Sequence, residues 1–263
     1  MSIHHVLLDP NYRPVIAHRG ASEFAPENTV PALQLGVDQG ADALEFDLHL
    51  AACGTPVLIH DPELDRTSSA TGKVSDHTVT QLQRFDAGHR FPGGERTFPW
   101  RDRGVVIPTL SEVLDRFPTV PMLIELKTVE VAEPARRVLL KHNAAGRVVL
   151  ASFLEAALRP FRGGPFVTSA SRIGILRLRL RSALGLGCKG PDLAYSVPER
   201  YRNLITIPTP ALIKAARTAG RPVHVWTVDD PIRANDLWNG GVSGIITNVP
   251  STILASRHPG ATR

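Results

Sequence analysis

The sequence has few of the features that mark specialised protein classes. It contains two cysteines, Cys53 and Cys188, which lie far apart and outside any CxxC pair. Zinc, redox and disulfide-scaffold architectures are therefore not indicated. Aromatic residues make up 6% of the chain, and no block rich in lysine and arginine has aromatics between its charges. Nucleic-acid binding therefore has little support.

Long hydrophobic runs are also missing. No stretch reaches the roughly 18 apolar residues that a membrane-spanning helix needs, so we expect no stable membrane insertion. The first residues, MSIHHVLLDPNYR, lack the pattern of a secretory signal, and the cytoplasm is the default location. The formal net charge of +5 in 263 residues is a mild excess that we attribute to background composition. Residues 1–12 and 256–263 are expected to be poorly ordered tails.

What the sequence does have is a regular alternation of short apolar runs and helical patterns. This rhythm predicts parallel βαβ units. At this length it favours one (β/α)8 barrel domain spanning residues 1–263, with an open doubly wound sheet as the alternative. No GxGxxG follows the first run, which weakens the alternative. The expected strands are 14–18, 43–50, 56–60, 121–127, 147–153, 165–170, 192–197, 222–228 and 243–248, and the expected helices include 28–39, 110–116, 133–142, 210–219 and 231–239.

Two segments interrupt this rhythm. Residues 62–108 are polar, rich in glycine and proline, and longer than an ordinary strand–helix loop, which is typical of a functional segment. The stretch RIGILRLRLRSALGLG, residues 172–187, would place Ile173, Leu176, Leu180 and Leu184 on one side of a helix. A membrane-surface helix is one interpretation. A solvated helix on the outside of the barrel is the favoured one.

Carboxylates sit at alternate positions of two predicted strands. Glu45 and Asp47 share one face of their strand, and Glu125 and Lys127 share a face of another, because side chains two apart point the same way. Ionised carboxylates inside a barrel repel one another and lose hydration. Salt bridges to nearby Arg and Lys could compensate. Three carboxylates without cysteine favour instead one hard divalent cation, Mg²⁺ or Ca²⁺.

Two histidines and two cations end strands in the same region. His18 and His60 could supply a general base and a general acid near neutral pH. Arg19 and Lys127 carry positive charge that suits a phosphate oxygen better than a neutral carbonyl. Trp226, at the end of a later strand, offers a flat apolar wall, although ordinary core packing would explain it equally well.

These residues, in this order, resemble the glycerophosphodiester phosphodiesterase family. The resemblance extends from residue 14 to residue 250, and its pieces are weak singly but strong in their joint order and spacing. They include His18-Arg19-Gly20, Pro26-Glu27-Asn28-Thr29, Glu45-Phe46-Asp47, His60-Asp61, IELK (124–127), VWTVDD (225–230) and GVSGIITNVP (241–250). One departure is Ala51-Ala52-Cys53, where the family usually has a threonine and a polar residue before the glycine.

The resemblance implies a TIM barrel with residues 62–108 as a segment inserted after the second strand, and we expect that segment to lie over the active site. It implies that Glu45, Asp47 and Glu125 bind the metal, that His18 and His60 form the acid/base pair, and that Arg19 and Lys127 hold the phosphate. The expected reaction is hydrolysis of a small glycerophosphodiester to sn-glycerol 3-phosphate and an alcohol. Lysophospholipase D activity and an inactive phosphate-binding barrel remain alternatives. Sphingomyelinase D enzymes are a related but less favoured match.

Overall fold

The computed structural model describes residues 6–93, 97–201 and 204–257. Within these residues, eight strands pair in parallel in the order β6-β5-β4-β2-β1-β11-β10-β7. A parallel bridge between Ser169 and Ala194 joins the two ends of this order and closes the ring. The ring consists of β1 (Val15–His18), β2 (Ala43–Leu50), β4 (Met122–Leu126), β5 (Val148–Ala151), β6 (Val167–Thr168), β7 (Tyr195–Pro198), β10 (Val223–Trp226) and β11 (Gly244–Thr247).

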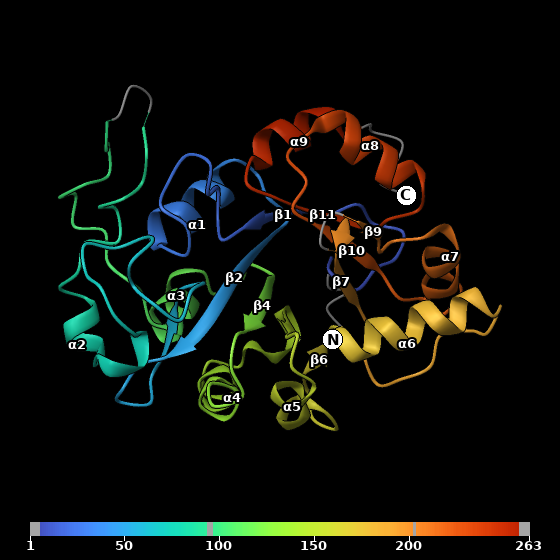
Figure 1. Cartoon of the computed structure of the whole chain (residues 1–263), viewed down its shortest axis with the longest axis horizontal. Helices are drawn as coiled ribbons and strands as arrows, with labels where there is room; N and C mark the ends of the chain where they lie inside the picture. The colour runs from blue at the N-terminus through green and yellow to red at the C-terminus, as the bar shows by residue number, and fades with distance from the viewer. Residues whose placement is uncertain (1–5, 94–96, 202–203, 258–263) are drawn as a thin grey trace.

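Helices surround the ring of strands (Figure 1). The closed parallel ring with its outer helices confirms the (β/α)8 barrel, and the open doubly wound sheet is wrong. The helices are α1 (Val30–Asp38), α3 (Leu110–Arg116), α4 (Ala132–Lys141), α5 (Glu155–Leu158), α6 (Arg172–Ala183), α7 (Pro210–Thr218), α8 (Pro231–Asn239) and α9 (Pro250–Ser256). The single turns η3 (Ala144–Arg147) and η4 (Arg159–Phe161) and the short pair β8 (Arg200–Tyr201) and β9 (Ile205–Thr206) complete this part of the chain.

The alternation along β2 divides the barrel wall into two faces. Leu44, Phe46 and Leu48 are fully buried and pack outward with residues of α1 and α3, including Leu33 and Leu110. The intervening Glu45 and Asp47 therefore face the barrel interior, as the period of two in the sequence predicts. Helix α3 begins where expected because Thr109 and Glu112 form a capping box.

A fully buried N-terminal residue fills part of the barrel interior. Leu7 is 0% exposed and packs in one apolar cluster with Ile16, Leu123, Val149 and Ile246 from the strands. The expectation of a poorly ordered tail is therefore wrong for residues 6–12, because the strands leave an apolar space that Leu7 fills. It is also wrong for Ser256, the last residue of α9, and for Arg257, which caps that helix. Residues 1–5 and 258–263 lie outside the described residues.

The segment between β2 and α3 builds a small unit of its own, seen on the left in Figure 1. Strand β3 (Pro56–Leu58) returns antiparallel to β2, so the expected strand 56–60 forms a hairpin and is not a barrel strand. The turn η1 (Val74–Asp76) and the short helix α2 (Val79–Leu82) follow. Their apolar side chains pack together with residues of the hairpin in one cluster, which includes Val57, Leu64, Leu82 and Ile107.

None of the helices in the described part of the chain has the length and apolar character needed to cross a membrane.

Removing the Leu7 side chain tests its role in the barrel interior. We expect Leu7→Ala to lower the free energy of unfolding by about 2–5 kcal/mol, because it leaves a cavity among fully buried groups. The half-buried neighbour Leu8 provides the control, and Leu8→Ala should cost clearly less. Urea unfolding followed by circular dichroism measures both. Equal losses in the two variants would show that Leu7 is no more important than its neighbour.

Candidate active site

The parallel strand register brings the predicted polar residues to one end of the barrel. His18 ends β1 beside Glu45 of β2, and Asp47 of β2 pairs in register with Glu125 of β4. Lys127 follows β4 directly, so it lies on the same side as Glu125. This is the carboxyl end of the strands, where (β/α)8 enzymes place their active sites.

Three carboxylates converge there. Glu45, Asp47 and Glu125 each offer an oxygen, and these oxygens lie within 4.8 Å of one another. Glu45 is 5% exposed and Asp47 only 1%. Burial, reinforced by the negative charge of Asp47, raises the pKa of Glu45 well above its usual value. Burial also raises the pKa of Glu125, so the cluster resists carrying its full negative charge.

Two cations hold Asp47 in its ionised form. Arg19 Nε lies 3.1 Å from Asp47 Oδ2, and Lys127 Nζ lies 2.9 Å from Asp47 Oδ1 and 3.0 Å from Glu125 Oε2. Asn28 donates a further hydrogen bond to Asp47 Oδ2 at 2.9 Å. Burial alone would raise the pKa of Asp47, but Lys127 and Arg19 outweigh it and lower that pKa below its usual value.

A tight turn directs Arg19 back toward the carboxylates. Arg19 has a φ of 56° and Gly20 a φ of 86°, both in the left-handed region. A Cβ added at Gly20 would lie 2.3 Å from the carbonyl carbon of Ala32, so only glycine fits there. The turn also lets the Arg19 backbone N–H donate to Glu45 Oε2 at 3.0 Å. The His18-Arg19-Gly20 sequence therefore forms the turn that orients Arg19, and it also supplies an imidazole and a guanidinium group to the site.

The donor set fits a divalent cation. Glu125 Oε1 is buried and accepts no hydrogen bond from the described residues. The three carboxylates outnumber Arg19 and Lys127, the two cations that contact them, and Arg19 is also shared with Glu27. A divalent cation would offset part of this excess of acidic groups. Oxygen ligands of this kind suit Mg²⁺ or Ca²⁺.

A hydrogen-bond chain fixes the orientation of His18. Its Nδ1 lies 2.7 Å from Asn248 Oδ1, and Asn248 Nδ2 donates to Asp229 Oδ2 at 2.7 Å. Because the Asn248 amide points its NH2 group at Asp229, its oxygen must accept from His18 Nδ1–H. Burial and the nearby charge of Arg19 lower the pKa of His18 to about 4. At neutral pH His18 is therefore uncharged, with Nε2 able to accept a proton.

A second chain fixes His60. Its Nδ1 lies 2.6 Å from Asp61 Oδ1, and Arg66 Nε lies 2.5 Å from Asp61 Oδ2. Arg66 also binds both oxygens of Glu27 at 2.7 Å, and Glu27 in turn accepts from Arg19 at 3.0 Å. Burial would raise the pKa of Asp61, but the bonds from Arg66 and His60 lower it to about 2. Asp61 therefore stays ionised beside the imidazole.

Several of these groups line one cavity of about 490 Å³, whereas the buried Asp47 is not among its lining residues. One half is polar and is lined by His18, Arg19, Glu45, His60, Glu125 and Lys127. The other half is mainly apolar and is lined by Phe153, Ile175, Leu176, Ile205, Ile207 and Trp226, although Arg172 and Arg179 also line the cavity. The Phe153 and Trp226 rings meet edge to face with centroids 6.0 Å apart. Trp226 thus contributes to a cavity wall.

Comparison with known proteins places the chain in a family. The model of the glycerophosphoryl diester phosphodiesterase family matches residues 18–158 and 177–252. A glycerophosphodiester phosphodiesterase from Caldanaerobacter subterraneus subsp. tengcongensis is 33% identical over 248 residues, which cover 91% of this chain and 96% of that protein. This chain belongs to the glycerophosphodiester phosphodiesterase family. The predictions of the family and of a phosphoric diester hydrolase are therefore confirmed.

Solved structures share the fold. The crystal structure of a glycerophosphoryl diester phosphodiesterase domain from Mycobacterium tuberculosis superposes with a TM-score of 0.82 at 23% identity, covering 94% of this chain and all of that one. A phosphodiesterase from Oleispira antarctica, solved with the product sn-glycerol 3-phosphate, has a TM-score of 0.75 at 25% identity. The alignment covers 93% of this chain and 96% of that one.

Some contacts of this family site were not foreseen from the sequence. The hydrogen bonds of Asn28 and Asn248 arise between segments that meet only in the fold. Asp61 stands next to His60, and that adjacency could have suggested its role. Arg66 lies within the irregular segment 62–108, where no periodicity predicts the direction of a side chain.

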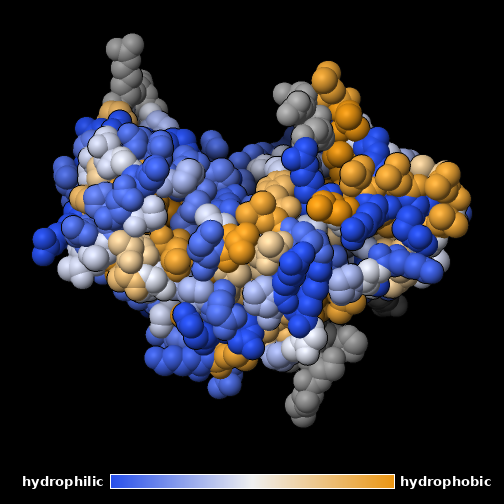
Figure 2. Space-filling view, turned by 60° about the horizontal axis from the view of Figure 1, so that its bottom comes forward, coloured by the Kyte–Doolittle hydropathy of each residue, from blue (hydrophilic) through white to orange (hydrophobic). Residues whose placement is uncertain are grey.

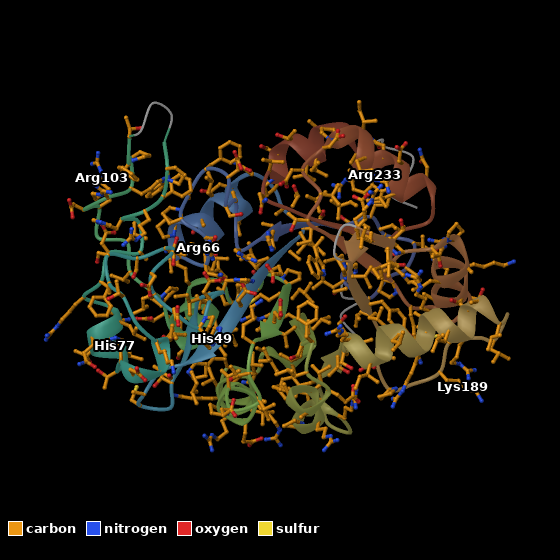
Figure 3. The ribbon with its side chains drawn as sticks, viewed as in Figure 1. His49, Arg66, His77, Arg103, Lys189 and Arg233 are labelled. Atoms are coloured by element: carbon orange, nitrogen blue, oxygen red, sulfur yellow. The ribbon has the colours of Figure 1, made fainter. Side chains whose placement is uncertain are left out.

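The segment 62–108 is attached beside the barrel mouth. Arg66 connects it to Glu27, and Trp100 Nε1 donates to the Phe24 carbonyl at 3.1 Å. Figure 3 shows Arg66 between this segment and the barrel strands, whereas Arg103 lies on the outer side. Among the described residues of the segment, none lines the cavity. The expected position of the segment over the active site stays a prediction.

Arg66 offers a test of the His60 chain. We expect Arg66→Ala to lower kcat/KM about 10-fold, because Asp61 loses the group that holds it against His60. The matched control is Arg103→Ala, which removes the same charge from an exposed position of the same segment and should leave kcat/KM unchanged. Steady-state hydrolysis of a glycerophosphodiester measures both. Equal kcat/KM values in the two variants would show that Arg66 does not contribute to catalysis.

Proposed function

We propose that the chain hydrolyses glycerophosphodiesters to sn-glycerol 3-phosphate and an alcohol. The observation that carries this proposal is the convergence of two oriented histidines, two cations and a cluster of three carboxylates at one end of the barrel, beside one cavity. Family membership supports it, as does the solved relative that binds sn-glycerol 3-phosphate. We keep the predicted cytoplasmic location as part of the same proposal.

In this proposal the phosphate binds between Arg19 and Lys127. Both cations line the polar half of the cavity, and both are anchored by Asp47, so their charge is fixed before the substrate arrives. Glu45, Asp47 and Glu125 hold one divalent cation, Mg²⁺ or Ca²⁺. When bound, that cation supplies positive charge that neutralises phosphate oxygens. Trp226 forms a wall beside the substrate.

The two histidines move the protons. His18 is neutral at pH 7 and donates Nδ1–H to Asn248, so its Nε2 takes the proton of the attacking hydroxyl group. His60, with Nδ1 held by Asp61, gives a proton from Nε2 to the leaving oxygen. The attacking group is either water or a glycerol hydroxyl that forms a cyclic phosphate opened later by water. The direct route needs these two proton transfers once. In the cyclic route the opening of the ring needs a second pair, one from the attacking water to a histidine and one from a histidine to the ring oxygen that leaves.

Metal removal tests the carboxylate cluster. We expect EDTA to abolish hydrolysis of glycerophosphocholine by the purified protein, and Mg²⁺ or Ca²⁺ to restore it. The control is Glu125→Gln, which should stay inactive after the cation is added back because one ligand charge is missing. Release of sn-glycerol 3-phosphate, followed with a coupled dehydrogenase, measures the rate. Full activity after exhaustive chelation would exclude the metal role.

Replacement of the histidines tests the proton transfers. We expect His18→Ala and His60→Ala each to lower kcat about 100-fold or more, the usual span for a positioned acid or base. In the wild type, kcat/KM should fall as the pH is lowered through about 4, where His18 takes up a proton and can no longer act as a base. An acid limb centred near the ordinary histidine pKa of about 6.5 would contradict this assignment. So would near wild-type kcat in either variant.

The apolar half of the cavity favours one second candidate, lysophospholipase D activity. In that reaction an acyl chain stays on the glycerol and needs an apolar groove beside the phosphate. Phe153, Ile175 and Ile207 line such a space directly next to the polar half. A small substrate was expected together with the polar segment 62–108 over the active site, but the described cavity wall comes from other elements.

A change at Phe153 separates the two substrate classes. We expect Phe153→Ser to lower kcat/KM for lysophosphatidylcholine about 10-fold and to leave kcat/KM for glycerophosphocholine within twofold, since only the lysolipid has an acyl chain to bury. Phe98→Ser, at a similarly exposed phenylalanine outside the cavity, is the control. No hydrolysis of lysophosphatidylcholine by the wild type, or equal losses on both substrates, would remove this second candidate.

A further inference from the structure

Helix α6 has apolar side chains on two opposite sides. Leu178 is buried against the apolar cluster between the barrel strands and the helices, and Ser182, one turn later, is buried as well. On the other side, Ile173 is 48%, Leu176 57% and Leu180 59% exposed. The outer apolar side is therefore not required for packing within the described fold.

The exposed side chains form one continuous stripe. Ile173, Leu176, Leu180 and Leu184 are spaced three or four residues apart, so they line one face of a helix with about 3.6 residues per turn. Leu184, just beyond the helix end, is 74% exposed. Helix α6 thus lies on the outside of the barrel, as the sequence favoured, but the side of the helix that faces the solvent is apolar.

Arginines border this stripe on both sides. The helical period places Arg172 and Arg179 along one edge and Arg177 and Arg181 along the other. Arg179 donates to the Thr206 carbonyl and Arg181 to the Gly187 carbonyl; both acceptors are uncharged, so these bonds cancel none of the positive charge. Beyond the helix, Lys189 extends from the following loop at the lower right of Figure 3.

A second element extends the apolar surface. Leu204 is 86% and Ile205 45% exposed, and the Arg179–Thr206 hydrogen bond of 2.7 Å joins their segment to α6. Figure 2 shows hydrophobic side chains gathered on this side of the molecule, at the right, with hydrophilic ones between them. Leu176 and Ile205 also line the active-site cavity, so the exposed surface continues into its apolar half.

We propose that this surface, formed by Ile173, Leu176, Leu180, Leu184, Leu204 and Ile205 with the four flanking arginines, binds reversibly to membranes that contain anionic phospholipids. An exposed apolar face bordered by cationic side chains matches the acyl–headgroup boundary of such a membrane. A second copy of the chain fits less well, because the arginine edges would meet like charges. The cavity would then open at the lipid surface. This binding does not depend on the proposed hydrolysis.

Vesicle flotation tests the proposal on the full chain without substrate. We expect binding to vesicles of phosphatidylcholine with phosphatidylserine, much weaker binding to phosphatidylcholine alone, and loss of binding as salt is raised. The double variant Leu180→Ser/Leu184→Ser should bind about 10-fold more weakly. Neither leucine lines the cavity, so its rate on soluble glycerophosphocholine should match the wild type. Leu140→Ser/Ile232→Ser changes exposed apolar residues elsewhere and should bind normally.

Arg177→Glu tests the charge contribution separately. It should remove most of the preference for phosphatidylserine, whereas Arg103→Glu should retain it. The proposal is overturned if the wild type does not bind anionic vesicles, or if both leucine double variants bind equally well. It is also overturned if the protein is a dimer that the Leu180→Ser/Leu184→Ser change dissociates, since the surface would then bind a second copy.

Discussion

Mutual repulsion among three closely spaced carboxylates, two of them buried, is the constraint on which the rest of the site depends. Oxygens of Glu45, Asp47 and Glu125 lie within 4.8 Å of one another because Glu45 and Asp47 share a face of β2 and Asp47 pairs in register with Glu125 of β4. Burial raises the pKa of Glu45 and of Glu125, whereas Lys127 and Arg19 lower the pKa of Asp47. The excess of acidic groups and their oxygen donors fit a divalent cation.

The surrounding residues fix the positions of the charged and titratable groups of this site. The left-handed turn at Arg19 and Gly20 brings a guanidinium back over β2, and separate hydrogen-bond chains fix Nδ1 of His18 and of His60. Only the polar half of the cavity takes part in this network. The apolar half is built from α6, β9, the end of β10 and loops. In the proposed function, different parts of the barrel would therefore carry the chemistry and the choice of substrate.

The sequence was informative where periodicity or adjacency determines direction. The alternation in β2 predicted that Glu45 and Asp47 face inward while Phe46 faces the helices, and the fold agrees. The sequence did not predict the contacts between distant segments, such as the hydrogen bond between His18 and Asn248. The sequence did not determine which face of α6 is buried, because this helix has leucines on two faces.

The central claim is that the carboxylate cluster binds a divalent cation, and thermal unfolding with and without Mg²⁺ or Ca²⁺ tests it most directly. A ligand that binds only the folded state at 100 times its Kd adds about 2.7 kcal/mol of stability. We therefore expect the wild-type Tm to rise with either cation, and the rise to disappear in Glu45→Gln and Glu125→Gln. A wild-type Tm that neither cation changes, or an equal rise in the two variants, would contradict the account.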